Sequence, residues 1–207
     1  MTLNLDFTEE QDMLRDMVRG LLGQYASNEQ IRALEDDPVG YSADLWAQLA
    51  ELDLIGLLLP AQYGGSEMSL LEGVILYEEF GRALAPTPHL VSAVVSAGAI
   101  VRAGSGAQRD EWLAKIAKGE AILTPAWLEP GNSFGPRGVQ VRAEADGDGW
   151  SISGTKQHVY FGAAADRLVV LARTGDADDA VDLFLVDPSA DGVTLTLMGR
   201  GFSAEQR

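Results

Sequence analysis

The spacing of apolar residues changes once along this 207-residue chain, near residue 120. Up to about residue 119, apolar side chains recur every three or four positions, which is typical of amphipathic helices. After residue 120, short stretches alternate between apolar and polar side chains and are separated by glycine-rich turns, which is typical of strands. We therefore expect an α+β protein, with an all-helical domain over residues 1–119 and an antiparallel, β-barrel-like domain over residues 120–207.

Serine and threonine residues mark several helix starts in the first half. Thr8 and Ser69 each stand three residues before a Gln or Glu, which is the capping-box arrangement, and Ser42 can cap a third helix. Residues 89–103 are apolar nearly all round, which indicates a helix that is buried on most sides. Gly119 is expected directly after the last helix, where a left-handed backbone favours glycine.

The second half predicts short strands joined by turns. The glycine-rich turn at residues 146–149 is expected to join the first two strands as a hairpin, and residues 175–179 form an acidic turn further on. Strands are expected at residues 139–145, 150–153, 168–171 and 181–186, with a last one around Leu195 and Leu197.

Charge and composition exclude several classes of function. The formal net charge is −16, which argues against binding to nucleic acid and to acidic membrane surfaces. The chain has no cysteine and only two histidines, His89 and His158, so we expect no disulfide, no thiolate site and no metal site. It begins without a basic and apolar leader and lacks an apolar stretch long enough to span a bilayer. We therefore expect a cytoplasmic protein.

Motifs in both halves resemble one known family. Glu129-Pro130-Gly131, a strand, the turn at residues 146–149, a second strand and Gly154-Thr155-Lys156 resemble the middle domain of the acyl-CoA dehydrogenases. The helical half resembles their N-terminal domain in the order of three motifs, at residues 7–11, residues 57–65 and residues 78–82. The resemblance covers the whole chain. It implies a cytoplasmic, oligomeric flavoprotein oxidoreductase of lipid metabolism and β-oxidation, in which FAD accepts hydrogen from an acyl-CoA substrate. It also implies electron-transfer flavoprotein as a partner and a homo- or hetero-oligomer with an acyl-CoA dehydrogenase-like chain.

The resemblance also implies where cofactor and substrate lie. It places cofactor contacts at Trp127, Leu128 and Ser133 in the first loop, and at His158 and Tyr160 in the second segment, where residues 158–160 are expected to form a strand. Ser133 and Phe134 are expected to face the acyl-CoA. Several of these residues depart from the family pattern: Leu128 and Tyr160 stand where threonine is usual, and His158 stands where a tryptophan packs on the flavin. Phe134 lies where the family has Gly-Ser-Asp, and its side chain cannot donate a hydrogen bond to a phosphate.

Two functions remain open on this sequence. One is an FAD-dependent acyl-CoA dehydrogenase, or a subunit or fragment of one; its glutamate base would lie in a C-terminal helical bundle absent from these residues. No catalytic residue is then expected within 1–207, and the chain alone should be inactive. The other is a flavin-free structural subunit of a heteromeric acyl-CoA dehydrogenase. Glu129 is interpreted as structural, and Glu78 and Glu79 are interpreted as a solvated helix face.

Overall fold

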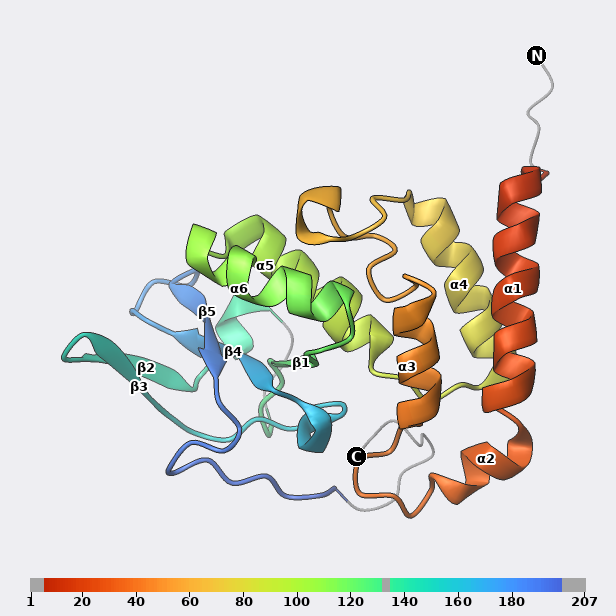
Figure 1. The fold of residues 1–207 in the computed structure, drawn as a ribbon. Helices are drawn as coiled ribbons and strands as arrows, with labels where there is room; N and C mark the ends of the chain where they lie inside the picture. The colour runs from red at the N-terminus through yellow and green to blue at the C-terminus, as the bar shows by residue number, and fades with distance from the viewer. Residues whose placement is uncertain (1–5, 132–134, 199–207) are drawn as a thin grey trace. The chain divides into compact units, whose positions relative to one another are not determined.

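A computed structural model describes residues 6–131 and 135–198, which fall into two compact units (Figure 1). The helical unit joins the chain up to Thr87 with Ser105–Glu120. The sheet unit joins Pro88–Gly104 with the chain from Ala121 onward. The apolar segment before Gly104 thus belongs with the strands, although the sequence groups it with the helices around it.

From residue 6 onward, where the structure describes it, the helical unit is built from five helices whose apolar faces meet. They are α1 (Glu9–Tyr25), α2 (Asn28–Ala33), α3 (Ala43–Glu51), α4 (Leu70–Ala83) and α6 (Gly106–Ala117), with a short 3₁₀ turn, η1 (Ala61–Tyr63). Helix α1 packs against α4 and, less extensively, against α3 (Figure 1). The core includes fully buried aliphatic side chains from these helices: Leu22, Leu45, Leu49, Ile75, Leu76, Leu113 and Ile116.

The predicted helix caps are confirmed. The backbone N–H of Gln11 donates to Thr8 Oγ1 at 3.2 Å, and the Gln11 side chain accepts from the Thr8 N–H at 3.0 Å. Ser69 forms the same reciprocal box at the start of α4. Ser42 accepts from the amide at the third position of α3. Gly119 follows α6 with a φ of 69°, a left-handed conformation that costs glycine little.

The interpretation of Glu79 as part of a solvated face is wrong, whereas Glu78 is exposed. Glu79 is 1% exposed and lies where α1 and α4 meet. Its carboxylate accepts hydrogen bonds from Arg19 Nη2 at 2.6 Å and Arg82 Nε at 2.7 Å. Hydrogen bonds from Arg19 lower the pKa of Glu79 the most and, with those from Arg82, outweigh the effect of burial. The buried charge is therefore paired from two sides.

Over its described residues, the sheet unit begins with helical structure and continues with five strands. The apolar segment forms a π-helix, η2 (Leu90–Ser96), which continues as α5 (Ala97–Ala103). The strands are β1 (Leu123–Ala126), β2 (Arg142–Asp146), β3 (Gly149–Ser153), β4 (Arg167–Arg173) and β5 (Val181–Val186). Two 3₁₀ turns, η3 (Pro136–Gly138) and η4 (Gly162–Ala164), lie in the connections. Helix η2 packs on β1, and the Leu123 N–H donates to buried Ser92 Oγ at 3.1 Å.

The expected antiparallel, barrel-like sheet is only partly correct, because the sheet is mixed. The pairs β2–β3 and β4–β5 are antiparallel, and the predicted hairpin forms around Gly147. However, β1 runs parallel to β4, from Leu123 opposite Arg167 to Ala126 opposite Val170, and β2 meets β4 in parallel at one residue pair. A long crossover allows a parallel pairing, and the chain between β1 and β4 supplies one.

Two predicted extended segments are not strands. Residues around Leu195 and Leu197 pair with no strand in the described part of the chain, and both leucines are exposed. Residues 158–160, read as a strand in the sequence, form a loop. His158 and Phe161 both have a φ of 54°, which breaks an extended backbone on either side of Tyr160.

Candidate functional site

Two segments of the sheet unit, residues 124–131 and 156–161, lie against each other and carry most of the predicted cofactor contacts. The backbone N–H of Gln157 donates to the Leu128 carbonyl at 2.9 Å, and the Gln157 side chain donates to the Glu129 carbonyl at 3.2 Å. Further along, Thr124 Oγ1 donates to the Tyr160 carbonyl at 2.6 Å. The structure thus brings the two motifs together by hydrogen bonds to backbone carbonyls, and none of these bonds depends on the altered side chains of Leu128, His158 and Tyr160.

Glu129 is the buried centre of this junction and is 4% exposed. Its carboxylate accepts from the backbone amides of Gln140 at 2.9 Å and Val141 at 3.1 Å, and from Lys156 Nζ at 2.6 Å. Burial would raise the pKa of Glu129, but the hydrogen bonds from Lys156 and the two amides together outweigh burial and lower it. A carboxylate held in its charged form by these donors is a poor general base. The structural interpretation of Glu129 therefore fits its surroundings.

Arg173, at the end of β4, is a residue that the sequence reasoning missed. It is 8% exposed, and its guanidinium donates to the carbonyls of Val139, Pro136 and Ala177 at 2.9, 2.7 and 2.6 Å. It therefore fixes the far end of the loop that starts at Glu129. A guanidinium offers five donors in a rigid fork, which suits a cluster of carbonyls. In the sequence, Arg173 merely ends an apolar strand, so no motif could reveal this role.

The predicted cofactor contacts have different surroundings. Trp127 is 45% exposed, and Leu128, His158 and Tyr160 are half-buried. Trp127 and His158 each lie one residue from the hydrogen bond between Leu128 and Gln157. The pair Ser133 and Phe134, predicted to face the acyl-CoA, lies outside the described residues. Three residues with ring side chains, one exposed and two half-buried, therefore lie at or near the junction.

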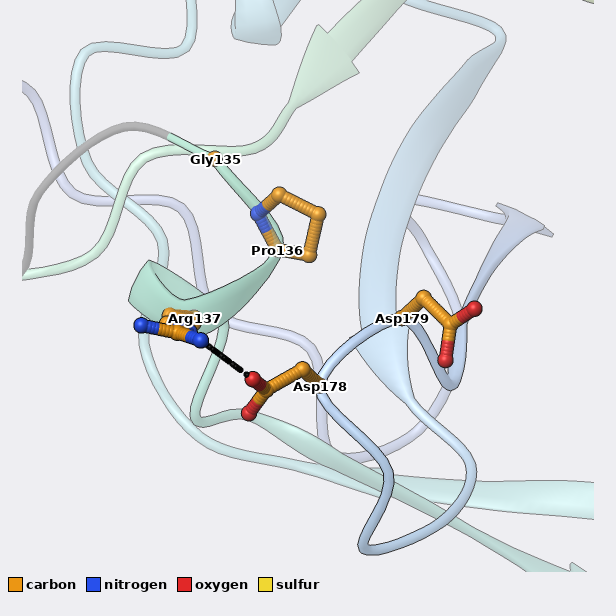
Figure 2. Close-up of a pocket in the computed structure, with 5 residues that line it drawn as sticks. All are labelled: Gly135, Pro136, Arg137, Asp178 and Asp179. Carbon is orange, nitrogen blue, oxygen red and sulfur yellow. Dashed lines mark hydrogen bonds and ion pairs between the residues drawn. The ribbon is translucent and has the colours of Figure 1, made fainter.

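A shallow, open pocket lies where the loop approaches the acidic turn between β4 and β5 (Figure 2). Its volume is about 310 Å³, and it is lined by Gly135, Pro136, Arg137, Asp178 and Asp179. Figure 2 shows Arg137 and Asp178 joined across it, with Arg137 Nη2 2.6 Å from the Asp178 carboxylate. Both side chains are largely exposed, so water screens this pair and it adds little stability.

Among the described residues, no group of three or more histidine, aspartate or glutamate side chains is arranged to hold a metal ion. In the same part of the chain, no helix combines the length and the apolar character needed to cross a membrane.

Comparison with known families matches both halves of the chain. Residues 8–120 match the acyl-CoA dehydrogenase N-terminal domain, and residues 125–205 match the acyl-CoA dehydrogenase middle domain. The chain belongs to the acyl-CoA dehydrogenase family. Apart from Thr124, the two segments of the site lie within the middle-domain match, so the resemblance seen in the motifs is confirmed.

The chain spans about half the length of the relatives described here. It is 31% identical over 196 residues to acyl-CoA dehydrogenase FadE27 of Mycobacterium tuberculosis, covering 94% of this chain and 50% of that protein. The ChsE4–ChsE5 complex from M. tuberculosis is 30% identical, with a TM-score of 0.81, covering 95% of this chain and 52% of the matched one. A glutaryl-CoA dehydrogenase from M. smegmatis in complex with FADH2 is 25% identical, with a TM-score of 0.85 and coverages of 96% and 50%.

Proposed function

We propose that this chain is part of an FAD-dependent acyl-CoA dehydrogenase that removes hydrogen from the α and β carbons of an acyl-CoA thioester. The observation that carries the proposal is the junction of the two motifs, where the backbone N–H of Gln157 donates to the Leu128 carbonyl. This contact sets the two proposed flavin-facing segments side by side. The family match and the relative that was solved with FADH2 support the same function.

The proposed cofactor contacts are Trp127, Leu128 and Ser133 in the loop, and His158 and Tyr160 in the facing segment. The rings of Trp127, His158 and Tyr160 offer surfaces on which a flavin ring can pack, and the Tyr160 hydroxyl can donate a hydrogen bond. Backbone amides of the loop can hold a pyrophosphate whatever the side chains are. FAD, when bound, supplies the redox chemistry as the acceptor of a hydride.

The acyl-CoA is proposed to approach the loop near Ser133 and Phe134. We propose that the base that removes the α-proton lies outside residues 1–207, since Glu129 is paired with Lys156 and with two amides. The 207 residues alone should then turn over no acyl-CoA. Electron-transfer flavoprotein as electron acceptor, a homo- or hetero-oligomer with an acyl-CoA dehydrogenase-like chain, and a cytoplasmic location remain part of this proposal.

A flavin-free structural subunit is the second candidate, and one observation favours it. Leu128 has no hydroxyl, and its carbonyl already accepts from Gln157, so its side chain offers a flavin no hydrogen bond. The loss of one such bond costs about 0.5–1.5 kcal/mol, or up to about tenfold in affinity. The solved ChsE4–ChsE5 relative is described as a complex of two components.

A flavin absorbance spectrum separates the two candidates. The chain is purified alone and after co-expression with an acyl-CoA dehydrogenase-like partner, and the bound flavin is measured per chain. The Leu128→Thr, Phe134→Ser double variant should raise the occupancy if the pocket is otherwise intact. If the double variant stays colourless even with its partner, the flavin-binding function is wrong and the structural subunit is preferred.

A further inference from the structure

We infer that the buried ion pair of Lys156 and Glu129 is a positioning pair that sets the geometry of the proposed flavin site; this inference rests on the proposed function. Neither residue is expected to touch the flavin. Their role is to fix the distance between the two segments that do.

The contacts of Lys156 point into the protein. Its side chain is 9% exposed and its Nζ lies 2.6 Å from Glu129 Oε1 and 3.4 Å from the Trp127 carbonyl. Both partners belong to the first segment, whereas Lys156 opens the second. A lysine that served the cofactor directly would keep its ammonium free for a phosphate or a ring oxygen, but here a carboxylate and a carbonyl already engage it.

Glu129 extends this connection to a third part of the chain. The amides of Gln140 and Val141, which lead into β2, also donate to its carboxylate. One carboxylate thus ties the loop, the Lys156 segment and the approach to β2 together. In the part of the chain that the structure describes, these segments have no strand pairing with each other, so buried side-chain contacts add to the backbone hydrogen bond between Gln157 and Leu128.

The ion pair lies close in sequence to the proposed contacts. Trp127 is two residues before Glu129, and His158 is two residues after Lys156. A change in the distance between Glu129 and Lys156 would therefore be passed to both rings. Small misplacements of groups that orient a ligand have large effects, which is why the residues supporting a site matter as much as its contacts.

Three variants test this inference in the full chain co-expressed with its acyl-CoA dehydrogenase-like partner. Lys156→Met removes the ammonium, and Lys156→Arg keeps the charge. Glu79→Gln is the matched control, since it alters a buried, paired carboxylate of the helical unit. Flavin dissociation constants and urea midpoints are measured for each. Lys156→Met should weaken flavin binding about tenfold, the lower end of the loss seen when residues that orient metal ligands are removed. Lys156→Arg should recover most of the flavin affinity. Glu79→Gln should lower the urea midpoint and leave the flavin affinity unchanged.

Lys156→Met leaves Glu129 buried without its cation and could fail to fold. The double variant Glu129→Gln, Lys156→Met removes both charges, which is far better tolerated than removal of one. It lacks the same ion pair and should also weaken flavin binding about tenfold.

The outcomes separate this inference from the function on which it rests. A wild-type chain that binds flavin, together with a folded Lys156→Met or double variant of unchanged flavin affinity, overturns the positioning role and leaves the function intact. If the wild-type chain and the Leu128→Thr, Phe134→Ser variant both stay colourless with the partner, the function and this inference are both overturned. If Glu79→Gln lowers the urea midpoint as much as Lys156→Met does and weakens flavin binding equally, the inference is also overturned. General destabilisation would then explain the loss of flavin affinity.

Discussion

Glu79 of the helical unit and Glu129 of the sheet unit are both buried carboxylates, but they accept hydrogen bonds from different kinds of donor. Glu79 accepts from Arg19 on α1 and Arg82 on α4. Both helices are already held by their own backbone hydrogen bonds. Glu129 accepts from two loop amides and from Lys156. The Glu79 carboxylate joins two helices that are already complete. The Glu129 carboxylate accepts hydrogen bonds from loop amides that no helix or strand pairs. A buried charge thus matters most where the backbone has no regular partner.

The largest expected effect comes from removing each carboxylate in turn. Glu129→Ala leaves the Lys156 ammonium buried without its carboxylate and frees two amides, which should cost about 3–5 kcal/mol of unfolding free energy. Glu79→Ala should cost less, roughly 1–3 kcal/mol, because Arg19 and Arg82 are half-exposed and return to water.

Urea unfolding followed by hydrogen exchange, resolved by peptide, assigns each loss to its unit. This resolution is needed because two units can unfold separately, and a single transition would then mislead. Equal losses for the two variants would contradict the comparison, since they would mean that it makes no difference whether the donors left behind are buried, as at Glu129, or half-exposed, as at Glu79.

Two serines of the π-helix η2 sharpen the same contrast on a smaller scale. Both are buried, but Ser92 Oγ accepts from the Leu123 amide, whereas Ser96 Oγ has no hydrogen-bond partner in the described part of the chain. Ser92→Ala leaves a buried amide unsatisfied and should cost about 1–3 kcal/mol. Ser96→Ala should be neutral or slightly stabilising. The two urea midpoints provide the measurement, with each variant acting as the control for the other.

The sequence predicted the features whose causes are local. The capping boxes at Thr8 and Ser69 and the hairpin around Gly147 were predicted correctly, because a few neighbouring residues determine each of them. The two site segments were also identified, since their motifs are short and ordered along the chain.

The features that were missed depend on distant partners. The parallel pairing of β1 with β4 joins residues more than forty positions apart, and nothing within either strand indicates it. Glu79 lies beside Glu78 in the sequence, and only the position of Arg19 on α1 shows which of the two is buried. Arg173 ends an apolar strand, and its carbonyl partners come from two separate loops.

The smallest expected effect is on how the unfolding free energy depends on pH. Hydrogen bonds lower the pKa of both Glu79 and Glu129 in the folded protein below the ordinary value of 4.5. A carboxylate with a lowered folded pKa contributes stability that is present above the unfolded pKa and lost as the pH falls through the folded one. The unfolding free energy should therefore stay level from neutral pH to about 5 and fall below about 4.5.

Glu79→Gln and Glu129→Gln should each make this fall shallower, because neither variant can take up the proton. Glu72 and Asp187 also have a lowered pKa, so neither variant should abolish the fall. Urea titrations at several pH values check this; parallel curves for wild type and Glu79→Gln would show that Glu79 does not contribute.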